Sequence, residues 1–141
     1  MIKNILVPTD GSDYSRRAMQ QAVDLAKALR AKIFLLHVIY TPETLGYVLT
    51  GGATVIQDQL NINGETVLHA TTHGIDFTGI EIEKKAEPGH PTGEILKEIE
   101  KLNIDLVVMG SHGYGQLAGP LLGSVSQKVL AKAHCPVLIV K

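Results

Sequence analysis

The chain has 141 residues, a formal net charge of −1, and 45% hydrophobic but only 4% aromatic residues. A charge this close to zero argues against a nucleic-acid-binding protein and against a polybasic membrane surface. No apolar run approaches the ~18 residues of a membrane span, and the amino terminus lacks the pattern of a signal peptide. Cys135 is the only cysteine, so no intrachain disulfide can form. We therefore expect one soluble, cytoplasmic domain covering residues 1–141.

Five short runs have the length and composition of β-strands. They are Ile2–Pro8, Lys32–Val38, Ile80–Ala86, Ile104–Met109 and Pro136–Val140. Several are nearly continuous in apolar residues, which is typical of parallel strands covered on both faces. The sequence Ile80-Glu81-Ile82-Glu83 alternates instead, which indicates a half-exposed edge strand.

Helical periodicity fills the segments between these strands. Apolar residues recur at helical steps over residues 12–31, 53–72, 91–102 and 124–133. Ser12 is a candidate N-cap, Pro91 suits a first helical turn, and Gly64 weakens the second of these helices. Residues 41–52 contain Pro and Gly and are predicted to form a mobile loop. Because strand and helix alternate along the chain, we expect an α/β fold with a parallel sheet and ligands at the carboxyl ends of its strands.

Two segments that follow predicted strands carry polar and glycine-rich sequence. The first is Pro8-Thr9-Asp10-Gly11-Ser12, where Asp10 is the best single carboxylate for contact with a ligand or metal. The second runs from Met109 to Ser126. Its glycines, Gly110 and Gly113, are interpreted as positions where no side chain separates a phosphate from backbone N–H groups.

A predicted helix start adds to this phosphate cradle. Gly123 precedes a helix whose first-turn N–H groups carry the positive end of the helix dipole. Ser124 and Ser126 are expected to add hydroxyl donors at the same end. A Gly-rich connection that only turns corners is the alternative.

Other motifs fit less well. The Walker A pattern needs a Lys between Gly123 and Ser124, where none stands. Residues 113–118 match G-x-G-x-x-A, but no acidic residue follows about 20 positions on. A receiver domain would need a phosphoacceptor Asp at the end of the third strand, where the sequence reads Lys85-Ala86-Glu87-Pro88.

The histidines do not predict a catalytic centre. His69 and His73 could share a helix face, but a zinc-protease motif needs Glu at the position of Ala70 and no third ligand is evident, so exposed polar residues are favoured. His112 directly follows Ser111 and is expected to brace its loop rather than act as a base. His37, near the end of the second strand, is interpreted as structural. No catalytic residue is predicted.

The glycines of the second segment form a longer pattern. Gly110-x-x-Gly113, nine residues, then Gly123-Ser124 resembles the G-2x-G-9x-G-[ST] ATP-binding signature of the universal stress protein family. The resemblance covers the whole chain through three further matches: Ile5–Ser12, Gly89-His90-Pro91 and His134–Val140. It implies an open five-stranded parallel sheet in the order 3-2-1-4-5, with helices on both faces.

The resemblance also implies a ligand and a partner. ATP, or ADP or AMP, would bind with Mg²⁺ or Mn²⁺ near Asp10. Adenine would lie at Val38 and the Pro8–Asp10 turn, ribose at Met109-Gly110, and the phosphates at the two glycine-containing turns. The expected binding residues are Pro8, Thr9, Asp10, Val38, Met109, Gly110, Ser111, His112, Gly113, Gly123, Ser124, Val125 and Ser126. A homodimer would form through the last strand, Pro136–Val140, while other protein partners stay unknown.

Three functions are open at this point. The leading one is a non-catalytic nucleotide-binding module for stress response or signalling. A slow ATPase or phosphoryl-transfer enzyme would need a positioned base and a cation, and Tyr114 stands where family members often carry a basic residue. A nucleotide-free dimerisation module is the third, against which the intact glycine signature speaks.

Overall fold

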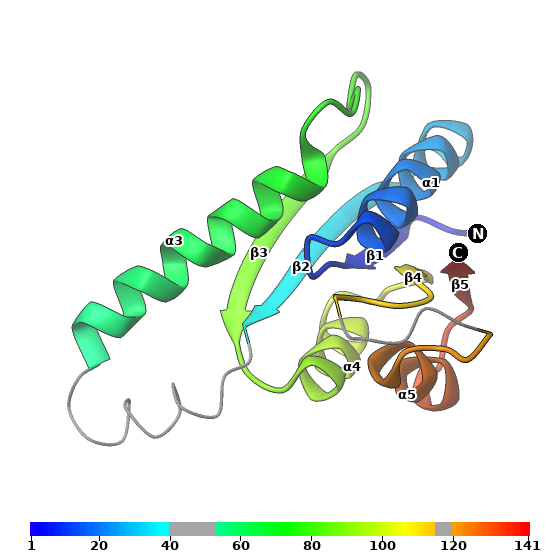
Figure 1. Ribbon diagram of the computed structural model, residues 1–141. Helices are drawn as coiled ribbons and strands as arrows, with labels where there is room; N and C mark the ends of the chain where they lie inside the picture. Colours follow the sequence, from blue (N-terminus) through cyan, green and yellow to red (C-terminus); the bar gives the residue numbers. More distant parts are fainter. Residues whose placement is uncertain (40–52, 115–119) are drawn as a thin grey trace.

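The computed structural model describes residues 1–39, 53–114 and 120–141, and within these the side chains of residues 53–62 are not described. The predicted loop over residues 41–52 therefore lies outside the described residues. Strands and helices alternate along the rest of the chain (Figure 1). They are β1 (Asn4–Pro8), α1 (Asp13–Leu29), β2 (Lys32–Ile39), α3 (Ala53–Thr72), β3 (Ile82–Pro88), α4 (Pro91–Lys101), β4 (Leu106–Gly110), α5 (Ser124–Lys132) and β5 (Val137–Val140).

The five strands form one parallel sheet in the order β3-β2-β1-β4-β5. This confirms the predicted fold class and strand order. The chain runs outward from β1 to β3 and then returns to the other side of β1, where Ile5 pairs with Leu106. The strand order thus reverses between β1 and β4, which is where such sheets bind ligands.

The edge strand β3 lies two residues later than predicted, at Ile82–Pro88 instead of Ile80–Ala86. The N–H of Ile80 donates to the carbonyl of Phe77 at 3.0 Å, which closes a turn where the strand was expected to begin. β3 pairs only with β2, so its expected place at an edge is confirmed.

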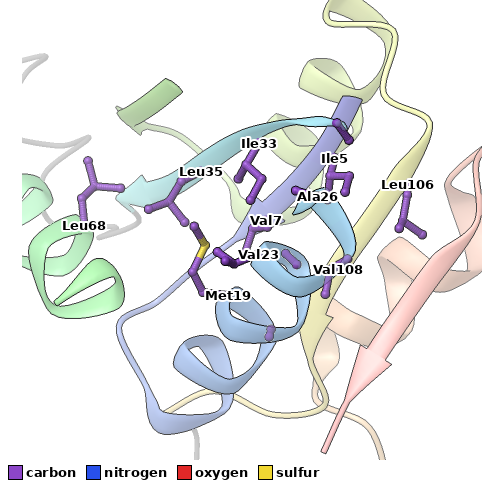
Figure 2. Close-up of a cluster of buried hydrophobic side chains, with 13 residues drawn as sticks. Ile5, Val7, Met19, Val23, Ala26, Ile33, Leu35, Leu68, Leu106 and Val108 are labelled. Atoms are coloured by element: carbon purple, nitrogen blue, oxygen red, sulfur yellow. The ribbon is translucent and has the colours of Figure 1, made fainter. Parts of the chain in front are cut away.

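Two hydrophobic layers sandwich the sheet, with α1 and α3 on one face and α4 and α5 on the other (Figure 1). Successive side chains of a strand point to opposite faces, so Ile5 and Val7 pack under α1 while Leu6 packs on the α4 side. Figure 2 shows the first layer, where Met19 and Val23 of α1 lie over the strands. This alternating burial explains why the strands read as continuous apolar runs.

The structure explains one sequence feature in each of two helices, Ser12 at the start of α1 and Gly64 within α3. Ser12 caps α1 as predicted, its side chain accepting a hydrogen bond from the N–H of Ser15. Gly64, expected to weaken α3, is buried against β3. A Cβ at this position would lie only 2.7 Å from the Cβ of Ala86, so the glycine allows helix and strand to approach closely. No helix among the described residues is both long enough and apolar enough to cross a membrane.

Candidate functional site

A cavity of about 650 Å³ lies at the carboxyl ends of β1, β2 and β4. Its volume is within the range of small-molecule sites. Of the residues predicted to bind nucleotide, the structure brings all but Ser111 to this cavity. The lining residues are Pro8, Thr9, Asp10, Ser15, Leu36, Val38, Pro91, Ile95, Met109, Gly110, His112, Gly113, Leu121, Leu122, Gly123, Ser124, Val125, Ser126 and Gln127.

One wall of the cavity is apolar, and sequence reasoning found only part of it. Leu36 stands two residues before Val38 on β2, and both belong to the hydrophobic layer that faces α4. Ile95 completes this wall from the first turns of α4. Strand periodicity could have identified Leu36. The sequence Gly89-His90-Pro91, noted as part of the family resemblance, could have directed attention to the start of α4.

Ser111 lies beneath the cavity rather than in its lining. Its N–H donates to the carbonyl of Val140 at 2.8 Å, and its own carbonyl accepts from the N–H of Gly123 at 2.8 Å. Its hydroxyl is bonded to Nδ1 of His112 at 2.9 Å. Ser111 is buried, so it joins β4 to β5 and to the start of α5, instead of facing a ligand as expected.

Asp10 is the carboxylate of the cavity, and hydrogen bonds from three residues hold it. Oδ1 accepts from the N–H of Ser12 at 3.0 Å and from the hydroxyl of Ser15 at 2.9 Å. Oδ2 accepts from the N–H of Tyr114 at 3.1 Å. Burial alone would raise the pKa of Asp10, but these hydrogen bonds outweigh it and lower the pKa below the ordinary value. Asp10 is therefore an anion fixed between the β1 and β4 loops.

The glycines of the β4 loop are required by close packing within the protein. A Cβ on Gly113 would collide with Oδ2 of Asp10, and one on Gly110 would lie 2.8 Å from the Cβ of Tyr14 on α1. The sequence interpretation gave these glycines the task of exposing backbone to phosphate. Their first effect in the structure is to let the β4 loop approach the β1 loop and α1.

Tyr114 of the β4 loop forms two hydrogen bonds to the β1 loop. Its hydroxyl donates to the carbonyl of Gly11 at 2.9 Å, while its N–H binds Asp10. The aromatic ring is 75% exposed, so burial of apolar surface contributes little to this contact. Tyr114, where the resemblance implied a basic residue, thus closes a bridge between the β1 and β4 loops. Gly115 and Gln116, which also differ from that pattern, lie outside the described residues.

The start of α5 presents unpaired backbone donors to the cavity. Its N-cap is Gly123, which makes no side-chain capping bond, and the first turn of a helix leaves its N–H groups without intrahelical partners. Ser124 is exposed there, and its predicted role as a hydroxyl donor stays a prediction. The hydroxyl of Ser126 differs from the prediction, because it is buried and donates to the carbonyl of Gly110 at 2.8 Å. The donors at this end are thus mainly backbone N–H groups.

Two histidines brace the loops around the cavity. Nε2 of His112 contacts the carbonyl of Leu121 and Nδ1 contacts the hydroxyl of Ser111. Because a carbonyl only accepts, the proton of a neutral ring is on Nε2, and Nδ1 accepts from Ser111. His37 is outside the cavity lining and bonds the carbonyl of Thr9 through Nδ1 at 2.8 Å. Both rings therefore have the bracing place expected for them.

A model of the universal stress protein family matches residues 1–141. The chain belongs to this family. Universal stress protein MJ0531 of Methanocaldococcus jannaschii is 36% identical over 141 residues, which cover all of this chain and 83% of that relative.

Solved structures of the family share its fold. The hypothetical protein MJ0577 of the same organism superimposes with a TM-score of 0.86 at 30% identity, covering 100% of this chain and 96% of that one. A universal stress protein determined in complex with cAMP matches with a TM-score of 0.62 at 30% identity, covering 99% and 96% of the two chains. An adenine nucleotide is thus bound by one structural neighbour of this universal stress protein.

Proposed function

We propose that this protein binds ATP in the cavity and acts as a non-catalytic nucleotide-dependent module. The observation that carries the proposal is the uncapped start of α5 in the lining of a cavity that also has an apolar wall. A flat aromatic base suits the apolar wall, and an anion suits the helix start. The cAMP complex of a relative supports an adenine nucleotide as the ligand class.

We propose a place for each part of ATP. Adenine would pack among Leu36, Val38 and Ile95, and ribose would lie at Met109 and Gly110. The phosphates would accept from the first-turn N–H groups of α5. The Pro8–Asp10 turn, held by Tyr114 and His37, would define the remaining side.

A divalent cation, Mg²⁺ or Mn²⁺, is proposed to accompany the phosphates. None of the described residues that line the cavity is Lys or Arg, and residues 40–52 and 115–119 contain neither in the sequence. Asp10 has about four lone-pair sites and uses three of them for hydrogen bonds, so it can supply at most one ligand. The cation would be held mainly by phosphate oxygens and water, and would neutralise the phosphate charge.

Calorimetric titration tests this proposal. We expect one site per chain for ATP, tighter with Mg²⁺ or Mn²⁺ than with a chelator present. Mass spectrometry of the purified, denatured protein would then identify whether ATP, ADP or AMP is carried from the cell. Absence of both heat and thermal shift at saturating ATP would refute the proposal.

ATP is proposed to be held rather than hydrolysed. Fast phosphoryl transfer needs positive charge at the γ-phosphate and a group that orients water. Both ring nitrogens of His112 are engaged with Ser111 and Leu121, so this histidine has no free base to offer. Phosphate release should be far below the ~1–100 s⁻¹ typical of kinases. A rate in that range that vanishes in Gly113→Val would favour the enzyme instead.

We further propose a homodimer through the edge strand β5. In one chain β5 pairs only with β4, and Leu138 is 37% exposed, so its outer edge can accept a second copy. Light scattering at micromolar concentration should give the mass of two chains. The carbonyls of Pro136 and Val140 accept from β4 and from the residue that follows it, so by strand alternation Ile139 directs its N–H to the outer edge. Ile139→Pro should therefore reduce the mass by removing that donor. A mass of one chain for the parent protein would refute the dimer. The cytoplasmic location expected from the sequence stays a prediction.

A further inference from the structure

Two histidines at the end of α3 form a pair that the proposed nucleotide site does not use. His69 is in the last turn of the helix, and His73 follows it with its N–H still bonded to the carbonyl of His69 at 2.9 Å. The two side chains therefore share one face of the helix. Their ring centroids are 5.5 Å apart, with the ring planes inclined by 45°.

The ring nitrogens of this pair are free to bind a ligand. Both side chains are exposed. Within the part of the chain that the structure describes, neither imidazole makes a hydrogen bond or an ion pair. Nearby Arg16 donates to the carbonyl of His73 at 3.1 Å and so is engaged with backbone rather than with a ring.

The separation of the rings suits chelation of a metal ion. Metal–nitrogen bonds of about 2.0–2.1 Å in tetrahedral geometry place two imidazole centroids about 5 Å apart. The observed 5.5 Å is close to this, so a small rotation of exposed side chains suffices. Neutral imidazole is a preferred ligand for Zn²⁺, Cu²⁺ and Ni²⁺.

We propose that His69 and His73 bind Zn²⁺ as a two-histidine chelate on the surface of α3. Among the described residues no group of three or more His, Cys, Asp or Glu side chains converges on a metal position. Water therefore completes the coordination, which makes the site open and exchangeable rather than a closed structural zinc site. This differs from a zinc-protease centre, because Ala70 replaces the glutamate that would act as general base.

The site is separate from the nucleotide cavity. Thr71, between the two histidines in sequence, is fully buried and its hydroxyl contacts that of Thr9 at 2.7 Å. The histidines lie on the opposite, solvent-exposed side of α3. Zn²⁺ binding therefore requires no nucleotide, and its test is independent of the proposed function.

Calorimetric titration with ZnCl₂ in the absence of nucleotide tests the proposal. Either His69→Gln or His73→Gln removes the chelate, and we expect about 100-fold weaker binding in each because the second ligand no longer acts at high effective concentration. His134→Gln is the matched control, since His134 is also exposed but lies near Glu100 rather than another histidine. Its Zn²⁺ affinity should equal that of the parent.

A second readout separates chelation from a change in folding. Zn²⁺ should raise the melting temperature of the parent and of His134→Gln, but not of the two single variants, all of which should have the same circular dichroism. Acidification should weaken binding because protonated imidazole cannot coordinate. Unchanged Zn²⁺ affinity in either His69→Gln or His73→Gln, or no binding by the parent, would overturn the proposal.

Discussion

The amino-terminal ends of α1 and α5 lie at the same end of the sheet, yet only α1 begins with a side-chain cap. At α1, the side chain of Ser12 caps the helix and the carboxylate of Asp10 accepts from Ser12 and Ser15. At α5, Gly123 has no side chain and makes no capping bond. The first helix start has a capping side chain and a carboxylate of the protein beside it, whereas the second has no capping side chain.

In the proposed nucleotide site, this difference would determine where a nearly neutral protein holds the phosphates. Both helix starts attract negative charge, but the start of α1 already has the carboxylate of Asp10 beside it. Asp10 also repels a second anion from the α1 side. If ATP binds as proposed, the internal carboxylate would direct the phosphates toward α5, although none of the described residues that line the cavity is Lys or Arg.

Gly113→Val should have the largest effect, because it acts on Asp10, which lies beside the start of α1 and lines the cavity. The new side chain would collide with Oδ2 of Asp10. We expect a loss of about 1–3 kcal/mol in unfolding free energy and no detectable ATP binding by calorimetry. Gly93→Val is the control, since nothing lies within 4 Å of a Cβ at this position of α4. Normal ATP affinity in a folded Gly113→Val protein would contradict the assignment of the cavity.

Gly123→Asp should make α5 resemble α1. Gly123 has φ −61° and ψ 159°, which any residue can adopt, so Asp can cap the helix. The unfolding free energy should rise by a few tenths to about 1 kcal/mol, while ATP binding should weaken more than about tenfold because an internal anion occupies the phosphate position.

Gly123→Asn separates the cap from its charge. It should stabilise the protein to a similar degree in urea denaturation, yet weaken ATP binding less than Gly123→Asp. Equal ATP affinity for the parent and Gly123→Asp would show that the phosphates lie elsewhere.

Asp10→Asn should reduce stability at neutral pH by about 1–2 kcal/mol, because the amide NH₂ would face the N–H donor of Tyr114. The folded pKa of Asp10 is lowered from about 3.8. Its stabilising contribution is therefore complete above that value and is lost as the pH falls through the folded pKa. Urea denaturation from pH 6 to pH 2 should show a steeper loss for the parent than for Asp10→Asn. Parallel curves would mean that Asp10 is not held as an anion.

Tyr114→Phe should have the smallest effect of these substitutions. It removes one exposed hydrogen bond, to the carbonyl of Gly11, and keeps the N–H bond to Asp10. We expect at most about 0.5–1 kcal/mol of lost stability and an ATP affinity that is only a few-fold weaker. A loss of binding as large as that of Gly123→Asp would instead make the hydroxyl part of the binding surface.

The sequence predicted the order of elements well, because burial on both faces leaves a strong signal in strands such as Leu106–Gly110. It also predicted most of the residues that line the cavity, since residues that follow neighbouring parallel strands meet at one edge of the sheet. Hydrogen-bond direction could not be predicted in this way. Ser124 and Ser126 look equivalent in the sequence. The folded structure shows that the hydroxyl of Ser126 donates to the carbonyl of Gly110.

The glycine signature illustrates a second limit. Its spacing identified Gly110 and Gly113 correctly as special positions, but gave no sign that Tyr14 and Asp10 occupy the space next to them. These neighbours are about 100 residues away in sequence, so only the folded structure reveals the contacts. Ile95 was missed for a different reason. A core residue and a cavity residue on one helix recur with the same periodicity, so the sequence does not distinguish them.

The central strand β1 is synthesised first, but its second neighbour, β4, follows only about 100 residues later. Asn4 pairs with Lys32 early, but its backbone N–H also donates to the carboxylate of Asp105, at 2.9 Å and a sequence separation of 101. Until β4 leaves the ribosome, β1 presents an unpaired edge in the middle of the future sheet. An emerging chain in this state can pair wrongly with another nascent copy. Long-range pairing of this kind also slows folding, so chaperone capture during translation should concentrate on chains that end before residue 106.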